Sequence, residues 1–363
     1  MKIKAKKSFT YKHVCYKSYT MLSSYSDQEI SEETKRLYSK LKNCGMSESV
    51  CQMYSYITLE INRLKKKRNA VVLAHTYTTP DILYGVADYV GDSLKLSMEA
   101  SKTKAEIIIF AGVVFMAETA KILNPAKRVF IVDRNAGCSL SDSITAEQVK
   151  ELKRQYPGRK VITYVNTTAA VKAESDICCT SANAQDIVAY LPDKEFIFVP
   201  DAYMAKNIEN ATGKKLITWP GKCIVHVEFK PDTIIEWKKL YHDMKVLSHL
   251  ECDSSVISLS DYAGGTEGIK RYIQSSDSKR FMIVTECGMS DRLRVEHPDK
   301  EFYGTCALCP YMKMNNLLGI LEALKNLPKK NEILLDKDII ERARVPVQRM
   351  VELTEEIKKS KGQ

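Results

Sequence analysis

The chain has 363 residues, which suffices for two or three domains, and its 44% hydrophobic and 28% charged residues describe a folded globular protein rather than a disordered one. The longest apolar run, residues 107–117, has 11 residues, about half of the roughly 20 that a membrane helix needs, so we predict no spanning segment. The net charge of +10 fits simple solubility, or attraction for acidic small molecules or nucleic acid. Because no nucleic-acid-binding motif occurs, acidic small molecules are favoured.

The N-terminal 26 residues carry six lysines and no acidic side chain. They could be an organellar transit peptide, a disordered basic tail, or sequence upstream of a true start at Met21. Residues 28–68 have apolar side chains at helical spacing, and we predict helices there. Since the regular pattern of the chain begins near residue 69, we expect removal of residues 1–50 to leave a folded, active protein.

From residue 69 onward, short β-branched runs alternate with helical stretches. We predict strands at residues 69–75, 105–112, 127–133, 160–166, 194–201, 214–220, 244–251, 255–261 and 279–286. Continuous apolar strands separated by helices are typical of parallel sheets that are covered on both faces. The fold class that follows is α/β.

Cysteines recur at a regular distance in this part of the chain. Cys138 and Cys223 are 85 residues apart, and Cys223 and Cys309 are 86 apart, each after the last strand of a similar block. With 11 cysteines the spacing alone could arise by chance. Other features share the period, however, and together they indicate three repeated α/β units.

Polar residues end the first strand of each unit. They are His75 and Tyr77, then Tyr164 and Asn166, then His249 and Glu251. Each unit also has a small polar turn before a helix, marked by Ser93, Ser181 and Thr266. Each turn alone could be a simple helix cap, but the threefold recurrence favours binding of carboxylate or phosphate at helix N-termini, beyond the carboxyl ends of the strands.

Cys306 and Cys309 form the only CxxC pair in the chain. Such a pair suggests half of a zinc site or a thiol redox pair. A zinc site of this type needs a second pair, so the CxxC spacing does not identify the chemistry by itself.

The motifs AHTY, GDSL, FMAETAKILNP, YVNTTAAVKA, DICCTSANA, CIVH, HLEC and CPYMKMN occur in this order. In these motifs, from about residue 57 to 358, the chain closely resembles the quinolinate synthases, the A-type proteins of de novo NAD biosynthesis. The resemblance implies three α/β/α sandwich domains with short parallel sheets, in pseudo-threefold arrangement around a central iron-sulfur site. The domains implied are residues 57–145, 146–231 and 232–311, after an N-terminal extension of residues 1–56 that is partly disordered or helical. The C-terminal helices of residues 312–358 are expected to pack back on the first domain.

The resemblance also implies one four-iron, four-sulfur cluster per chain, held by Cys138, Cys223 and Cys309, with Cys306 a bystander or an accessory redox thiol. Three protein ligands leave one iron open to act as a Lewis acid. The implied reaction condenses iminoaspartate with dihydroxyacetone phosphate to quinolinate, with loss of phosphate and two waters. An L-aspartate oxidase or aspartate dehydrogenase would supply the iminoaspartate.

The resemblance assigns ligand contacts to a set of residues at the strand ends and helix starts. They are His75, Ser93, Tyr164, Val165, Asn166, Ser181, His249, Leu250, Glu251 and Thr266. Among them Glu251 is the candidate general base, Tyr164 and His249 are further catalytic candidates, and Tyr77 matches a tyrosine that assists in the triose-phosphate chemistry. His226, three residues after Cys223, could support the metal ligands.

The sequence departs from the family pattern at Gly265, where the family usually has a serine, and at Leu250, where HPEC is commoner than HLEC.

A radical enzyme of the diphthamide type, or a zinc or thiol redox module, stays open as an alternative. We expect a cytoplasmic monomer or homodimer that binds neither nucleic acid nor membrane. If the N-terminus is a transit peptide, the compartment would instead be a plastid or another organelle.

Overall fold

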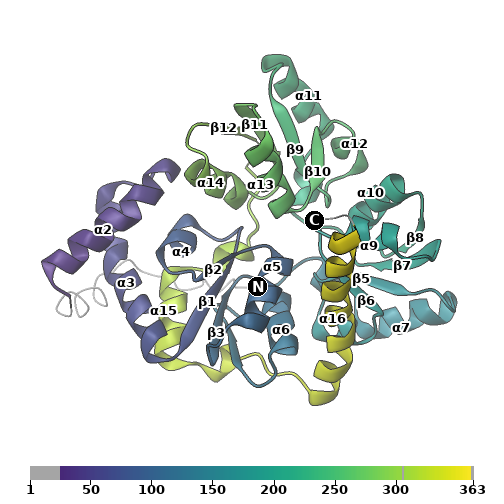
Figure 1. Cartoon of the computed structure of the whole chain (residues 1–363), viewed down its shortest axis with the longest axis horizontal. Coiled ribbons are helices and arrows are strands. Elements are labelled where there is room, and N and C mark those ends of the chain that lie inside the picture. Colours follow the sequence, from purple (N-terminus) through teal and green to yellow (C-terminus); the bar gives the residue numbers. More distant parts are fainter. Residues whose placement is uncertain (1–24, 305, 361–363) are drawn as a thin grey trace, which may run out of the picture.

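The computed structural model describes residues 25–304 and 306–360, and it contains three sheets of four parallel strands each within that part (Figure 1). Each sheet has the same strand order, with the first strand of the unit between the second and the third and with the fourth at the edge. All strand pairs in the three sheets are parallel. The predicted α/β class with three repeated units is therefore confirmed.

The first unit holds β1 to β4 and the second holds β5 to β8. Their strands are β1 Ala70–His75, β2 Tyr89–Gly91, β3 Ile107–Ala111, β4 Arg128–Ile131, β5 Val161–Tyr164, β6 Ile177–Cys179, β7 Glu195–Val199 and β8 Lys215–Thr218. Their helices are α4 Pro80–Gly85, α5 Ser93–Lys102, α6 Val114–Leu123, α7 Ala146–Gln155, α8 Ala169–Ala173, α9 Ala184–Tyr190 and α10 Ala202–Thr212.

The third unit holds the remaining strands and is followed by two C-terminal helices. Its strands are β9 Lys245–His249, β10 Tyr262–Gly264, β11 Arg280–Val284 and β12 Glu301–Tyr303, and its helices are α11 Pro231–Leu240, α12 Ser254–Ile257, α13 Thr266–Ser275 and α14 Cys287–Glu296. The chain ends with α15 Leu317–Asn326 and α16 Lys337–Ser360. Short 3-10 turns lie at η1 Lys42–Cys44, η2 Ser141–Ser143, η3 His226–Glu228, η4 Met312–Met314 and η5 Lys329–Asn331.

The strand prediction for residues 255–261 is wrong, whereas the other eight predicted runs each contain a strand. The apolar alternation in this stretch resembles a strand, but the side chain of Asp253 accepts a hydrogen bond from the backbone N–H of Ser255 and caps the short helix α12. Val256 is the buried residue of that helix, and the strand β10 begins only at Tyr262.

The central strands are buried because helices cover both faces of each sheet, as their β-branched composition predicts. All five residues of β3 are buried, and large aromatic side chains such as Phe110, Phe198 and Phe281 are almost fully enclosed. One continuous core cluster includes residues from all three units. The carboxyl ends of the central strands are thereby held at fixed positions relative to one another.

The N-terminal extension contains α2 Asp27–Leu41 and α3 Glu48–Lys67, which confirms the prediction of helices for residues 28–68. Leu37, Leu41 and Cys51 are almost completely buried there and pack with Tyr84 of α4. Residues 27–50 therefore contribute to the core, which argues against the prediction that removal of residues 1–50 leaves a folded, active protein. The proposed transit peptide falls on residues that lie outside the described ones.

The C-terminal helices tie the units together. α15 lies against α3 of the N-terminal extension and β3 of the first unit, whereas α16 packs along α8, α9 and β6 of the second unit and on α6 of the first. None of the helices that the structure describes is long and apolar enough to cross a bilayer.

Candidate functional site

The carboxyl ends of the three sheets face a common cavity. The last residues of β1, β5 and β9, namely His75, Tyr164 and His249, each pair in register with the last residue of a short edge strand. Most of the predicted site residues line the cavity together: His75, Tyr77, Ser93, Tyr164, Asn166, Ser181, His249, Glu251 and Thr266. The repeat that the sequence suggested therefore converges on one site.

Two of the predicted contact residues lie elsewhere. Val165 and Leu250 are buried in the large core cluster and are not among the described residues that line the cavity. Their neighbours on both sides do line it.

Cys138, Cys223 and Cys309 each follow the fourth strand of a unit, and all three line the cavity. In the described part of the chain, none of the three forms a disulfide. Burial raises the pKa of Cys138 to about 12 and also raises the pKa of Cys309. Buried thiols of this kind stay neutral unless a metal holds them as thiolates, so three such groups from three units fit a metal centre that is bound by sulfur.

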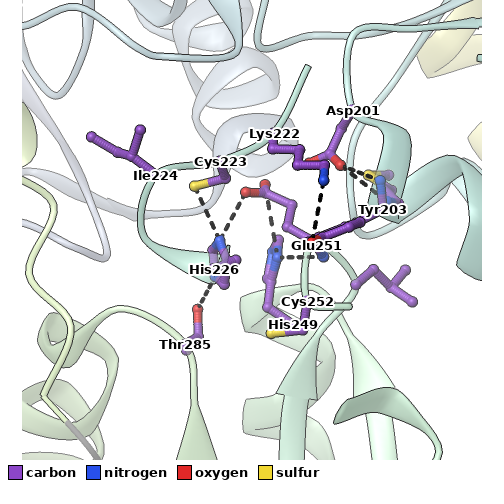
Figure 2. A network of polar contacts seen from close by, with 12 residues as sticks. Asp201, Tyr203, Lys222, Cys223, Ile224, His226, His249, Glu251, Cys252 and Thr285 are labelled. Atoms are coloured by element: carbon purple, nitrogen blue, oxygen red, sulfur yellow. Dashed lines mark hydrogen bonds and ion pairs between the residues drawn. The ribbon is translucent and has the colours of Figure 1, made fainter. Parts of the chain in front are cut away.

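Glu251 lies at the centre of a hydrogen-bond network (Figure 2). Its Oε1 accepts a hydrogen bond from the Tyr164 hydroxyl at 2.5 Å, and its Oε2 lies 2.9 Å from Nδ1 of His226. Burial alone would raise the pKa of Glu251, but the imidazoles of His226 and His249 and the hydrogen bonds from His226 and Tyr164 lower it below its ordinary value. The lowered pKa means that the carboxylate is ionised at neutral pH and that it binds a proton less readily than an ordinary glutamate does.

His226 connects the carboxylate to a cysteine. Its Nδ1 lies 3.2 Å from Sγ of Cys223, and its ring stacks on His249 at a centroid distance of 4.7 Å. Cys223, His226 and Glu251 together offer three ligand atoms within 4.8 Å of one another. This group could hold a single metal ion, whereas the three cysteines offer sulfur ligands from three sides.

Two buried polar atoms of the cavity wall have no hydrogen-bond partner within the described residues. They are Oδ1 of Asn166 and Oγ1 of Thr266. Buried polar atoms are rarely left unpaired in native proteins, because the lost hydrogen bond costs roughly 1–3 kcal/mol. Each of these two atoms could therefore form a hydrogen bond with a polar group in the cavity.

The predicted helix starts differ in detail. Ser93 and Thr266 are the first residues of α5 and α13, and the preceding residues Asp92 and Gly265 are the caps. Ser181 lies in a turn before α9, which begins at Ala184. Ser93 and Ser181 are therefore not the N-cap residues of these helices, and both residues line the cavity.

Sequence reasoning missed the residues that follow β11. Thr285 hydrogen-bonds both Tyr77 and His226, and Glu286 accepts a hydrogen bond from the backbone N–H of Cys309. Their position just beyond a buried strand, where the other polar site residues also lie, could have drawn attention to them. Glu286 also forms an ion pair with Lys313, whose Nζ donates to the carbonyl of Tyr77.

Cys306 forms a disulfide with Cys287, the first residue of α14. The sequence analysis expected Cys306 to be a bystander or an accessory redox thiol and named no partner cysteine for it. The spacing of the cysteines does not point to Cys287 as that partner. Cys306 itself is not among the described residues that line the cavity, although Cys309 is.

Comparison with known proteins shows the family to which the chain belongs. Residues 59–352 match the family model described as Quinolinate synthetase A protein. The chain is 46% identical to a quinolinate synthase of Sinorhizobium fredii over 89% of each chain. It is 43% identical to a quinolinate synthase of Agrobacterium fabrum over 97% of this chain and 99% of the relative, and 42% identical to one of Caulobacter vibrioides over 90% and 89%. The chain therefore belongs to the quinolinate synthetase A protein family and is a quinolinate synthase by homology to these enzymes.

Proposed function

We propose that the enzyme condenses iminoaspartate with dihydroxyacetone phosphate to give quinolinate, phosphate and two waters, as a step of NAD biosynthesis. One observation carries the proposal: three cysteines, one after the fourth strand of each sheet, face the same cavity as the histidine, tyrosine and glutamate side chains of the strand ends. Both substrates are polyanions, which suits the net charge of +10.

Cys138, Cys223 and Cys309 would hold the four-iron, four-sulfur cluster. When bound, such a cluster with three protein ligands supplies an open iron that polarises a substrate oxygen as a Lewis acid. The fit rests on three buried thiols from three units at one cavity, none of which forms a disulfide in the described part of the chain. Soft thiolate ligands in this number favour iron-sulfur chemistry over a hard cation.

Glu251 would act as the general base. Its carboxylate is ionised, is enclosed by the cavity wall and shares one oxygen with the Tyr164 hydroxyl at 2.5 Å. Formation of the imine bond and enolisation of the triose both release protons that a positioned carboxylate can take. Tyr164 would hold the carboxylate in place. Its hydroxyl would stay hydrogen-bonded to Glu251 when the charge of the carboxylate changes.

The remaining polar groups would bind the carboxylates and the phosphate. Thr266 and Asn166 each offer a buried atom without a partner among the described residues, and Ser93 and Ser181 add hydroxyls to the same cavity. A side-chain carbon at Gly265 would lie 2.8 Å from Oγ of Ser181, which leaves no room for the usual serine in this arrangement. We infer that the backbone at the start of α13 takes over the contact to an anion.

We further propose that the enzyme is cytoplasmic. An L-aspartate oxidase or an aspartate dehydrogenase would supply its iminoaspartate. Iminoaspartate hydrolyses in water, so the supplying reaction must run alongside this one. A coupled assay with either enzyme therefore provides the substrate.

The decisive experiment is anaerobic reconstitution followed by metal and product analysis. We expect about four irons and four acid-labile sulfides per chain and quinolinate formed from the two substrates. One metal ion per chain without sulfide would instead support a single site at Cys223, His226 and Glu251.

Glu251→Gln should keep the iron but lose about 10²–10⁴-fold in turnover. A variant that retains more than about a third of the rate would show that Glu251 is not the base.

A further inference from the structure

A buried amide of the neighbouring unit holds the loop that carries Glu251. Asn207 belongs to α10 of the second unit, whereas Glu251 follows β9 of the third. Nδ2 of Asn207 donates one hydrogen bond to the carbonyl of Leu250 at 2.9 Å and another to the carbonyl of Cys252 at 2.8 Å. These two residues come immediately before and after Glu251 in the chain. Asn207 therefore binds the backbone on both sides of Glu251.

The amide of Asn207 uses both of its N–H protons in these contacts. A backbone carbonyl can only accept, so the nitrogen of the amide must face Leu250 and Cys252. The amide oxygen, Oδ1, has no hydrogen-bond partner among the described residues, although Asn207 is only 5% exposed. A buried oxygen without a partner costs stability. The two donated hydrogen bonds are therefore the contribution that this side chain makes.

The helix α10 is itself fixed within the second unit. Asp201 caps its first turn by accepting from the backbone N–H groups of Tyr203 and Met204, and the side chain of Met204 is completely buried. The helix packs on α9, β7 and β8 of its own unit and also contacts α12, the short helix that follows the Glu251 loop (Figure 1). The position of the second unit is therefore passed to this loop through Asn207.

The equivalent loop of the second unit has the same arrangement. Lys172 of α8 is completely buried, and its Nζ donates to the carbonyls of Val165 and Thr167. These two residues flank Asn166, which lines the cavity. The loop lies 85 residues before residues 250–252, at the period of the repeated units. A lysine of one helix and an asparagine of another thus meet the same need, which is a buried donor for both carbonyls around a cavity-lining residue.

The two loops differ in the unit that supplies the donor. Lys172 belongs to the same unit as its loop, whereas Asn207 belongs to the second unit and binds a loop of the third. The second unit also supplies Tyr164, whose hydroxyl donates to Oε1 of Glu251 at 2.5 Å. We propose that Asn207 is a positioning residue that holds the backbone of Glu251, so that its carboxylate meets Tyr164 and the substrate at a fixed distance. This inference rests on the proposed function, in which Glu251 is the general base.

Loss of the amide should impair catalysis rather than substrate binding. A displacement of the catalytic group by about 1 Å can cost about 10²-fold in rate. Asn207→Leu keeps the approximate volume and removes both donors. In the reconstituted full-length enzyme we expect it to keep about four irons, to lower kcat about 10- to 100-fold and to leave both KM values within about threefold. In a Glu251→Gln background, followed in single turnovers, it should cost less than about twofold, because the carboxylate through which Asn207 acts is gone.

Asn331→Leu is the matched control. Asn331 is also buried, and its Nδ2 also donates to two backbone carbonyls, those of Ile131 at 2.9 Å and Val132 at 2.8 Å, but this backbone carries no proposed catalytic residue. Both leucine variants should lower the thermal midpoint, because two carbonyls lose their partner. Asn331→Leu should nevertheless keep its iron and a kcat within about twofold of the wild type.

Two results would overturn the proposal. One is an equal loss of kcat in the two leucine variants, and the other is a loss from Asn207→Leu that is as large in the Glu251→Gln background as in the wild type. Asn207→Ser is a second, smaller variant in case the leucine prevents folding. Its hydroxyl has one proton and can serve only one carbonyl, so kcat should fall at least about fivefold. A serine variant with the wild-type kcat would also contradict the proposal.

A measurement of geometry separates this inference from the proposed function. In a crystal structure of Asn207→Leu, the distance from the Tyr164 hydroxyl to Oε1 of Glu251 should exceed about 3.5 Å, whereas Asn331→Leu should keep it near 2.5 Å. An unchanged distance in Asn207→Leu would overturn the inference, whether or not quinolinate forms. If Glu251→Gln instead keeps the wild-type rate, the proposed base is wrong, and this distance alone decides whether Asn207 positions the carboxylate.

Discussion

His75 and His249 hold their rings in the same way at equivalent strand ends. The backbone N–H of Tyr77 donates to Nδ1 of His75 at 3.2 Å, and that of Glu251 donates to Nδ1 of His249 at 3.3 Å. In both cases the N–H donor lies two residues further along the chain. A neutral imidazole that accepts at Nδ1 carries its proton on Nε2. Both rings are therefore set to donate a hydrogen bond, which suits an anionic substrate.

The protonation of His75 also gives a stability prediction. Burial, followed by the neighbouring His249 and Arg292, lowers the pKa of His75 to about 3 from an ordinary value near 6.5. Below pH 6.5 the unfolded chain binds a proton at this residue and the folded protein does not, so stability falls as the pH drops. Between pH 6.5 and 5.5 His75 should cost about 1 kcal/mol.

The measurement compares thermal midpoints at pH 6.5 and 5.5 for the wild type, His75→Gln and His242→Gln. His242 is exposed and serves as the matched control. We expect His75→Gln to lose less stability on acidification than the wild type does, and His242→Gln to follow the wild type. Parallel changes in all three proteins would mean that His75 takes up its proton in the folded state.

At the scale of elements, contacts with the start of α14 hold the loop that carries Cys309 in place. Glu286 caps that helix by accepting from Gly288, and it also accepts from the backbone N–H of Cys309 at 3.1 Å. The Cys287–Cys306 disulfide joins the same helix to the same loop at a second point. The backbone of Cys309 is thus held by Glu286 independently of Cys306.

We therefore expect different results from the two cysteines of the CxxC pair. Cys309→Ser should yield protein with little iron and almost none of the visible absorbance of a cluster, because a ligand is lost. Cys306→Ala should keep the iron and most of the activity, because Glu286 still holds the loop. Iron per chain and quinolinate formed, both measured without oxygen, check this. If both variants lost the cluster, the disulfide would be necessary for the geometry of Cys309.

These elements also show what the sequence could reveal. The central strands follow from β-branched runs such as residues 105–112, and the cysteine period follows from the repeat of the units. The edge strands β2, β6, β10 and β12 were missed, because three residues give too little pattern to recognise. The Thr285 bridge and the Cys287–Cys306 disulfide could not be predicted, because they join residues that only tertiary packing brings together.

At the scale of the whole molecule, the units are locked together close to the cavity. Arg292 of α14 is buried, and its Nη1 donates to Oγ1 of Thr76 at 2.8 Å and to Oε1 of Glu267 at 2.9 Å. Thr76 lies between His75 and Tyr77 in the first unit, and Glu267 follows Thr266 in the third. One guanidinium thus fixes two walls of the site relative to each other.

The N-terminal helices reinforce the same junction from outside. Arg36 of α2 donates to the backbone carbonyls of Tyr84 and Gly85 in the first unit. The hydroxyl of Tyr84 in turn donates to the carbonyl of Arg292, and Sγ of Cys44 donates to the carbonyl of Asp291 in the third unit. The extension thus contacts both units whose alignment Arg292 secures.

This arrangement predicts that α2 stabilises the assembled molecule. Leu37 is 1% exposed and packs with Leu41, Cys51 and Tyr84, so Leu37→Ala should cost about 2–5 kcal/mol of unfolding free energy. Lys40→Ala on the exposed face of the same helix should change stability by less than about 0.5 kcal/mol. Thermal midpoints of the two variants at one pH give the comparison. Equal midpoints would mean that α2 contributes little to the fold, and that residues 1–50 can be removed after all.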